Sequence, residues 1–589
     1  MGDLAVTDFL GLRNDRGPKY IGNDRFFDLI NFNYDSFVGA DKILFPDRVN
    51  SAEYQAGKSI DGIFEFNFLN SSGVSVIEKL FLTNGKLYKD PDNQILISSD
   101  FQTGKCTFTT YENKLYIANG LNYQKIYNGE SVTEQGAPFI KINGAGILTG
   151  NYYYAVTYVT AAGEEIIGTK SNTISTLNNS VNLELPIGYD GTISRKIYRT
   201  EANGNQLKLL ASIPDNLTLD YVDFVSDASL GVNIPAVNNE LPKVFFIETS
   251  KDILIGCVNS KEPTQIYPTD GLSDVFDFAN FTSTSSISND NTPIVGMKPD
   301  YDLLIIGTNK NIFILDCEDP SALSLVLTRA NVGVKNGYGM VNVPTGEDFP
   351  GGVMFPTTLD DIRLFSGNFA QPVATSLDNL KTSNFGQPIK QSLASIIKSG
   401  SKFSGFFYDY KYHLAVDEKT LAFDIRNQSW WMYNYGAYSY GLYGGFLYRG
   451  LFEQSYLEEM YSDISYLGTE MEGFVKSGDL VASEDFKYFF ELHIFYANTA
   501  GAKITVQIVV DDNFDDIIEE DFEIEAGSFD FDFYNEQFYE TSSGYDDFKV
   551  FYINKWGRWV NFIITNTEGR LLFRGYRVLT QEVLNKESA

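Results

Sequence analysis

The chain of 589 residues has few of the side chains on which disulfide frameworks, zinc sites and catalytic triads depend. Its three cysteines, Cys106, Cys257 and Cys317, lie far apart and form no CxxC pair, so neither a disulfide framework nor a zinc site is indicated. The two histidines, His413 and His493, each lie in an alternating, strand-like segment, which favours a structural role for both. No run of 18 apolar residues occurs and no basic segment with an apolar core opens the chain, so we expect neither a secretion signal nor a membrane-spanning segment.

Basic residues are also scarce. The chain has 45 Lys and Arg against 77 Asp and Glu, which gives a formal net charge of −32 and a pI near 4.4. This balance argues against a protein that holds nucleic acid by neutralising phosphates, because such binding requires clustered Lys and Arg. An acidic solvated surface explains the charge most simply. A wall lined with carboxylates would in addition let DNA pass without adsorbing to it.

What the chain has in quantity is Tyr, Phe and Gly, at 37, 46 and 50 residues, against only four Trp and seven Met. This composition fits pleated sheets joined by tight turns and predicts an all-β fold. Short alternating strands closed by Asn, Asp or Gly recur as β-hairpins, at 79–90, 113–130, 301–317, 360–368 and 408–433. Their recurrence predicts a β-propeller of roughly six or seven blades.

The pattern changes along the chain, which predicts several units within the fold. The five expected divisions are an irregular N-terminal segment that packs on the propeller or a neighbour (1–61), the first blades (62–137), an inserted immunoglobulin-like β-sandwich (138–237), the remaining blades (238–475) and a C-terminal β-sandwich (476–589). We expect little helix, and the one stretch that suggests a helix is 379–399.

Two strings approach known ligand-binding loops. AEYQAGKS at 52–59 resembles a phosphate-binding loop, but a strand pattern follows it where a phosphate loop needs a helix. DDNFDD at 511–516 begins like a calcium loop, yet the sixth place holds Asp516 and the twelfth Phe522, so a solvated strand connection is the simpler interpretation. A catalytic pair of carboxylates of the glycosidase type stays possible, because the sequence does not give the distance between two carboxylates. The tryptophans are more typical of cores and interfaces than of sugar-stacking sites; they are Trp430, Trp431, Trp556 and Trp559.

Several stretches, taken in order, resemble the tail nozzle, or tail tube, proteins of short-tailed bacteriophages. They are GLRNDRGP with DLINFNYDSFVGADKILFPDR, YIANGLNYQKIYNGE, GNYYYAVTYVTAAGEE with RKIYRT, SDVFDF with PIVGMKPDYDLLIIGTNKNIFIL, and GRWVNFIITN with FRGYRV. The resemblance spans nearly the whole chain, and the order of the stretches carries it.

This resemblance implies a virion protein, assembled in the host bacterial cytoplasm, that forms a homohexameric ring below the portal and adaptor rings together with other tail proteins. Double-stranded DNA would pass through the ring during ejection without specific binding. The family supplies no catalytic residues, so we expect no enzyme activity, no cofactor and no metal. The acidic turn formed by Asp511, Asp512, Asp515 and Asp516 is our candidate for a loop that faces the lumen.

Two other functions stay open at this point. A receptor-binding or glycan-degrading propeller on the same virion would carry paired carboxylates or exposed tryptophans in a pocket at the propeller axis. A bacterial surface adhesin is the third possibility, and the missing signal peptide weighs against it.

Overall fold

A computed structural model describes much of the chain. The described residues are 2–6, 12, 23, 25–35, 39–42, 45–163, 165–236, 241–257, 260–271, 273–276, 281–319, 322–328, 330, 332–346, 349–366, 382–384, 395–426, 428–463, 472–480, 486–497, 501–524 and 547–582. Nearly all of their regular structure is antiparallel strand; the helical residues among them are α1 (Thr284–Ser288), the 3-10 turns η2 (Asp227–Ser229) and η3 (Gly337–Gly339), and Ser395 with Ile396. The all-β class predicted from composition is confirmed. No helix in the described ranges is long and apolar enough to cross a membrane.

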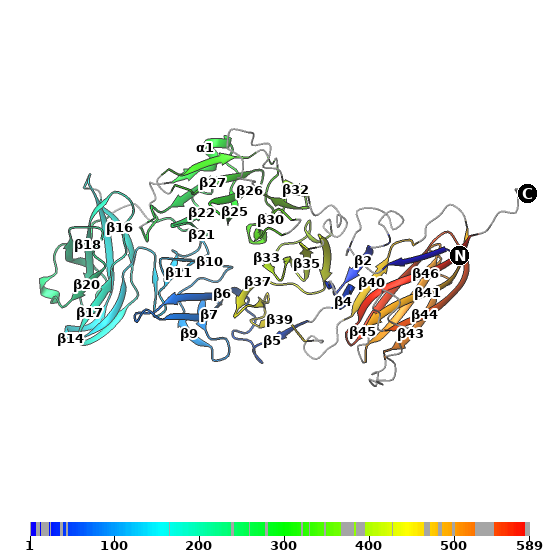
Figure 1. Ribbon diagram of the computed structural model, residues 1–589. Coiled ribbons are helices and arrows are strands. Elements are labelled where there is room, and N and C mark those ends of the chain that lie inside the picture. The colour runs from blue at the N-terminus through cyan, green and yellow to red at the C-terminus, as the bar shows by residue number, and fades with distance from the viewer. Residues whose placement is uncertain are drawn as a thin grey trace, which may run out of the picture.

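Seven four-stranded antiparallel sheets make up the centre of the described structure (Figure 1). In chain order they are β6 (Ile60–Leu69), β7 (Ser75–Thr83), β8 (Lys86–Lys89), β9 (Ile95–Ser98); β10 (Thr107–Tyr111), β11 (Lys114–Ala118), β12 (Lys125–Tyr127), β13 (Val132–Glu134); β21 (Phe246–Ser250), β22 (Ile253–Cys257), β23 (Gln265–Pro268), β24 (Thr282–Ser283); β25 (Ile294–Asp300), β26 (Leu303–Thr308), β27 (Ile312–Asp316), β28 (Ser324–Leu327); β29 (Val341–Val343), β30 (Gly352–Pro356), β31 (Ile362–Phe365), β32 (Thr382–Asn384); β33 (Phe403–Tyr408), β34 (Lys411–Val416), β35 (Lys419–Asp424), β36 (Ser429–Tyr433); and β37 (Ser439–Tyr443), β38 (Phe446–Gly450), β39 (Leu457–Asp463) with β5 (Phe45–Arg48).

These sheets form a closed ring, which we call the seven-sheet ring. The first strand of each sheet lies beside the first strand of the next, in the order β6, β10, β21, β25, β29, β33 and β37, and β37 returns to β6. The local reason is the hairpin chemistry of the sequence: Asn84 with Gly85 and Asp409 with Tyr410 adopt positive φ at two of the turns, so consecutive strands fold back tightly. The expected helix at 379–399 is supported only at its end, where Ser395 and Ile396 are helical, while β32 occupies Thr382–Asn384 and 385–394 lies outside the described residues.

The N-terminal strand β5 closes the ring by pairing with β39, the third strand of the last sheet. At this closure Glu458 is fully buried and accepts from the guanidinium of Arg449 at 2.6 Å, while the Arg48 guanidinium lies 3.5 Å away. A buried carboxylate is stable only when it is paired in this way. The closure therefore joins the first and last thirds of the chain by both a strand ladder and a buried ion pair.

Two facing sheets interrupt the ring between β13 and β21, and we call them the insert. One sheet contains β14 (Phe139–Tyr152), β17 (Ile174–Glu184) and β20 (Asp220–Asp223), and the other β16 (Glu165–Lys170), β15 (Tyr154–Thr160), β18 (Thr192–Thr200) and β19 (Leu207–Ile213). Arg199 on β18 reaches Asp223 on β20 at 2.6 Å, and Tyr154 donates to the same carboxylate at 2.8 Å. This buried polar tie connects the two sheets across their apolar core.

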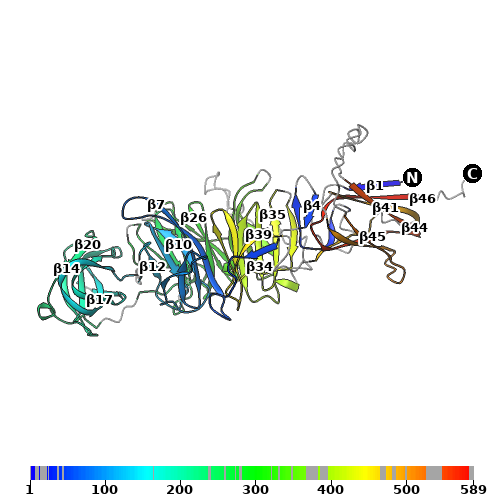
Figure 2. The ribbon, with the colours of Figure 1, turned by 90° about the horizontal axis from the view of Figure 1, so that it is seen from below.

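A second pair of sheets, the terminal unit, combines the C-terminal strands with the N-terminal ones. One sheet runs β3 (Phe32–Asp35), β4 (Gly39–Lys42), β46 (Leu572–Glu582), β41 (Lys487–Ala497) and β44 (Asp547–Gly557), with β1 (Gly2–Val6) also on β46; the other runs β2 (Phe26–Ile30), β40 (Gly473–Ser477), β45 (Val560–Glu568), β42 (Lys503–Val510) and β43 (Ile518–Glu523). The insert, the ring and the terminal unit follow one another in a row in both views (Figures 1 and 2).

The N-terminal segment, expected to be irregular and to pack on the propeller or a neighbour, does contact the ring but is not irregular. Its described residues contain five short strands, of which β1 to β4 belong to the terminal unit and β5 to the ring. Local periodicity did not predict them because their partners lie far away in sequence: Phe26 pairs with Ser477, and Leu4 with Val578. The terminal sheets also reach further back than the expected boundary, since β40 begins at Gly473.

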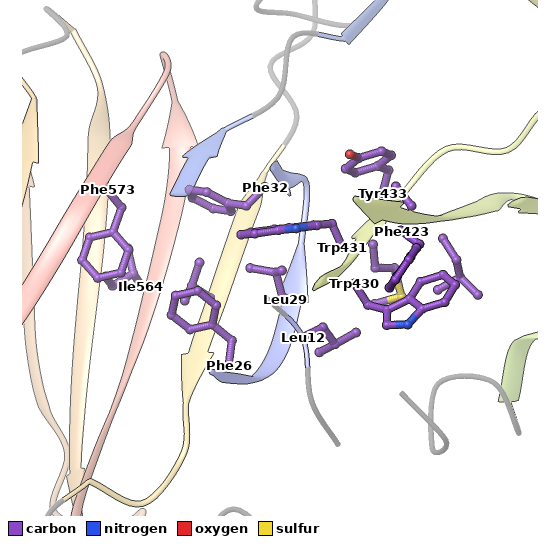
Figure 3. Close-up of a cluster of buried hydrophobic side chains, with 14 of the residues drawn as sticks. Leu12, Phe26, Leu29, Phe32, Phe423, Trp430, Trp431, Tyr433, Ile564 and Phe573 are labelled. Carbon is purple, nitrogen blue, oxygen red and sulfur yellow. The ribbon is translucent and has the colours of Figure 1, made fainter. Parts of the chain in front are cut away.

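The largest core of the molecule runs from the ring into the terminal unit (Figure 3). Leu12, Leu29 and Phe32 lie between Trp431 of β36 on one side and the terminal sheets with Phe573 on the other, and all are buried. Backbone hydrogen bonds accompany this packing: Leu12 N–H donates to Trp430 O at 2.7 Å and Asn31 N–H to Met432 O at 2.8 Å. The N-terminal strands thus join the ring and the terminal unit into one continuous core.

We expect Phe32→Ala to lower the free energy of unfolding by about 3 to 5 kcal/mol, because removing a fully buried phenyl ring leaves a cavity in this core. Urea unfolding followed by tryptophan fluorescence measures the change. Phe446→Ala is the matched control, since that ring is mostly exposed on β38 and its loss should cost little. Equal stability of the two variants would contradict a continuous core at this junction.

Candidate functional site

The acidic turn at 511–516 connects β42 to β43, as the sequence predicted, and it lies on the surface of the terminal unit. Asp511 and Asp512 adopt left-handed backbone conformations with φ near +53° and +55°. The Asp511 carboxylate accepts from Arg558 N–H at 2.6 Å, and Asp516 pairs with Lys555 at 2.8 Å. Asp515 is exposed. Asp512 accepts from the Asn561 side-chain amide at 3.3 Å, so three of the four carboxylates have structural partners, and whether the turn faces a lumen stays a prediction.

The described part of the chain contains no group of three or more His, Cys, Asp or Glu side chains that could hold a metal ion. His413 lies buried in β34 with Nε2 2.5 Å from the Tyr461 hydroxyl, and burial lowers its pKa to about 3. The three cysteines are free and buried, and burial raises the thiol pKa of each.

The string AEYQAGKS at 52–59 leads into strand β6, so it lacks the helix that a phosphate-binding loop needs.

The four tryptophans separate into core and surface positions. Trp430 and Trp431 are fully buried in the core between the ring and the terminal unit. Trp556, in contrast, is 56% exposed on β44, in the outer sheet of the terminal unit. Sequence reasoning did not distinguish it from Trp430 and Trp431, because all three lie in strands; Trp559 lies in the connection between β44 and β45.

Trp556 belongs to a row of exposed aromatic rings along β44. Phe548, Tyr552 and Trp556 are 44%, 65% and 56% exposed, while Phe551 and Ile553 between them are buried in the core. Neighbouring rings on β41 fix their orientation: His493 stacks on Phe548 at 5.7 Å, and Tyr488 meets Trp556 edge-on at 5.0 Å. We call this outward side of β41 and β44 the aromatic face. A strand that is apolar on both sides is the sequence signal that would have found it.

The opposite sheet of the terminal unit presents a different surface. Along its edge strand β43, Glu519, Asp521 and Glu523 are exposed, while Ile518 and Phe522 point into the core. Two of these carboxylates are held by β42, since Thr505 donates to Asp521 at 2.6 Å and Gln507 to Glu519 at 2.7 Å. We call this surface the acidic face. The terminal unit thus carries an aromatic side and a carboxylate-rich side.

A further cluster of titratable groups lies at the centre of the ring. Lys105, just before β10 in the second sheet, donates to Phe403 O at the start of the sixth sheet at 2.6 Å, so its side chain crosses between sheets that are not neighbours. The ammonium lies 4.3 Å from the ring centroid of Tyr338 and 5.4 Å from that of Tyr438. Burial lowers the pKa of Lys105 to about 7. Sequence reasoning missed this residue, because only the closed ring brings its partners together.

Asp61 on β6 completes the central cluster. Its backbone carbonyl accepts from Cys106 N–H at 3.0 Å, and burial raises the pKa of its carboxyl to about 6 despite hydrogen bonds from the backbone of Gly104 and Asn84. An aspartate and a lysine with displaced pKa values are typical of functional sites and of internal ties alike. Here the lysine's carbonyl and aromatic partners occupy the centre, which favours an internal tie.

Asp274 joins the insert to the ring. Its carboxylate accepts from the Tyr116 hydroxyl of β11 at 3.0 Å and from Ile187 N–H of the insert at 3.2 Å. Its own N–H donates to Ile187 O, so the contact is reciprocal. The entry and exit of the insert also meet, since Gly136 packs against Leu241. The insert is therefore held to the ring by buried polar contacts as well as by the chain itself.

No family model matches this chain, and no curated protein is similar to it in sequence. Among solved structures, it is weakly similar to the computationally designed Ika8 protein, with 9% identity over 70% of this chain and 98% of that one and a TM-score of 0.32. It is also weakly similar to Kluyveromyces lactis Hsv2 (10% identity, 56% and 95% covered, TM-score 0.22) and to the extracellular domain of BT4673 from B. thetaiotaomicron (10%, 95% and 75%, 0.26). Likenesses this low carry no argument about function.

The raised pKa of Asp61 predicts a pH-dependent stability. Between its usual pKa of 3.8 and about 6, the unfolded chain releases the proton while the folded chain retains it, so this residue's contribution to stability falls as the pH rises. We expect the melting temperature of the wild type to drop relative to that of Asp61→Asn between pH 4 and pH 6.5. A constant difference across this range would contradict the burial of the carboxyl group.

Lys105 predicts a dependence in the alkaline range. Its folded pKa of about 7 lies below the usual 10.5, so between these values the unfolded chain binds a proton that the folded chain does not. Its contribution to stability is lost as the pH falls from 10.5 to 7. Differential scanning calorimetry should show that the melting temperature of the wild type rises relative to that of Lys105→Met between pH 7 and pH 9.5. An unchanged difference between the two melting temperatures would mean that the Lys105 amine is exposed to water.

Proposed function

We propose that this chain is a structural subunit of the tail nozzle of a short-tailed bacteriophage. Six copies form a ring below the portal and adaptor rings, and the genome passes through it during ejection. The seven-sheet ring is a seven-bladed β-propeller, the insert an immunoglobulin-like β-sandwich and the terminal unit a β-sandwich. The ordered resemblance over nearly the whole sequence supports this assignment.

The observation that carries the proposal is the continuity of the structure across its three units. The core at Trp431, Leu29 and Phe32 runs without a break from the ring into the terminal unit, and Asp274 holds the insert by reciprocal hydrogen bonds. Interfaces this well packed suppress the domain motions expected of loosely linked units. A wall that must hold its shape while DNA passes requires such rigidity.

The acidic turn is the proposed lining of this conduit. Asp515 projects its carboxylate into solvent from the β42–β43 connection, while Asp511, Asp512 and Asp516 bind neighbouring residues and hold the turn in shape. Carboxylates repel phosphate, so the polymer slides past without adsorbing. The net charge of −32 is consistent with such a wall.

A second candidate function is the binding of receptor or glycan. The observation that favours it is the row of exposed rings on β44, because aromatic rings stack on sugar faces. Binding of a polysaccharide by the isolated full chain, abolished by Trp556→Ala, would favour this candidate.

Mass photometry and electron microscopy of the purified full-length protein test the proposal. We expect closed rings of six 66.1-kDa subunits with a central lumen. In a map of that ring, the acidic turn should lie on the lumen wall. A protein that stays a monomer at micromolar concentration, or that cleaves a polysaccharide, would overturn the assignment.

A further inference from the structure

We infer that Asn143, in strand β14 of the insert, is a site of spontaneous deamidation, a covalent modification that replaces a neutral carboxamide by a carboxylate. The reaction occurs within an Asn–Gly pair and needs water as its only co-reactant. Six Asn–Gly pairs occur in the sequence, and local structure distinguishes this one from the other five. The site is independent of the proposed ring.

The modification proceeds in two balanced steps. The backbone nitrogen of Gly144 attacks Cγ of Asn143 and forms a C–N bond, while the Cγ–Nδ2 bond breaks and ammonia leaves with the proton of the Gly144 N–H. Water then opens the resulting five-membered succinimide at one of its two carbonyls, which gives aspartate or isoaspartate. Glycine favours the first step because it has no Cβ to block the approach and its backbone is permissive.

The backbone at this pair lies outside the regular sheet ladder. Strand β14 pairs with β17 at Ile142 and again at Ala145, and Asn143 and Gly144 between them have no register partner, because a bulge interrupts the ladder there. Gly144 has a φ of +70°, and no atom lies within 4 Å of the position that its Cβ would take. The approach of the Gly144 nitrogen to the Asn143 side chain is therefore not blocked by the sheet.

The reacting carboxamide has no protein partner. Asn143 is exposed, and within the described ranges no hydrogen bond involves its side chain. Strand β17 contacts only the main-chain oxygens of the pair: Ser180 Oγ donates to Asn143 O at 2.6 Å and Asn179 Nδ2 to Gly144 O at 3.1 Å. A deprotonated peptide carries much of its charge on oxygen, so the Ser180 hydroxyl stabilises the anion from which the Gly144 nitrogen attacks.

In two of the other pairs, the glycine nitrogen that must attack is already engaged. The Gly120 N–H donates to Val244 O at 2.8 Å, and the Gly204 N–H donates to Glu201 O at 2.9 Å. Both hydrogen bonds would have to break before the nitrogen could reach the side chain. We therefore expect the asparagines before these two glycines to react slowly.

The remaining three pairs are restrained in other ways. The Asn128 carboxamide accepts from Ser131 N–H at 3.0 Å, and the Asn336 carboxamide accepts from Tyr338 N–H at 2.9 Å. In the pair at 84–85, Gly85 is buried in the turn between β7 and β8. Each of these side chains or glycines is held in a conformation that deamidation would disrupt.

The test follows the purified full chain during storage in mildly alkaline buffer by peptide mass spectrometry, with electron-transfer fragmentation to distinguish isoaspartate from aspartate. We expect deamidation at Asn143 to be at least tenfold faster than at any other Asn–Gly pair. In urea the six rates should become similar, because each asparagine then precedes glycine in an unfolded chain. A faster site elsewhere in the folded protein, or a tenfold preference for Asn143 that persists in urea, would overturn the inference.

Ion-exchange chromatography of stored protein provides a second measurement, with Asn143→Gln and the matched variant Asn128→Gln. The wild type and Asn128→Gln should both develop a more acidic species, since each conversion adds one negative charge. Asn143→Gln should form it at least tenfold more slowly, because attack on the longer side chain requires a six-membered ring. Equal formation of the acidic species in all three proteins would show that Asn143 is not its source.

Discussion

The structure depends on the packing of the N-terminal strands between β36 and the terminal sheets. Leu12, Leu29 and Phe32 fill the space between Trp431 and Phe573, and backbone hydrogen bonds to Trp430 and Met432 fix their register. Without these strands, two apolar surfaces would face water and the ring would lose its closing strand β5. Because their partners lie hundreds of residues away, neither the ring nor the terminal unit is complete until nearly the whole chain has been made. Such non-local pairing is slow to form and costly to break.

Sequence reasoning predicted the elements whose signal is local. Hairpins such as 79–90 and 301–317 carry their turn residues and alternation in one short stretch, and the structure places antiparallel strands there. The N-terminal strands escaped prediction because pairs such as Leu4 with Val578 leave no periodic trace in either segment. For the candidate sites the limits were similar. The acidic turn was recognised as a strand connection, but Lys105 gains its partners only through ring closure, and the exposure of Trp556 depends on which sheet of the terminal unit β44 joins.

Different parts of the structure contribute rigidity, surface charge and internal cross-links. Buried junctions make the molecule stiff, and the acidic turn supplies surface charge without an ion site in the described residues. The central lysine adds an internal tie between sheets that do not touch along their strands. Together these features suit the proposed role of a structural part that keeps its shape.

The contact between Gly136 and Leu241 brings the two ends of the insert to one point on the ring. Lengthening a connection between two ends that already meet costs little, because the entropy of loop closure rises by only about 0.6 kcal/mol for each doubling of length. The hundred residues between them are therefore free to lengthen, shrink or be replaced over evolutionary time, provided that a residue able to reach Asp274 is kept. The insert can therefore change in sequence and size while the seven-sheet ring that carries it stays the same.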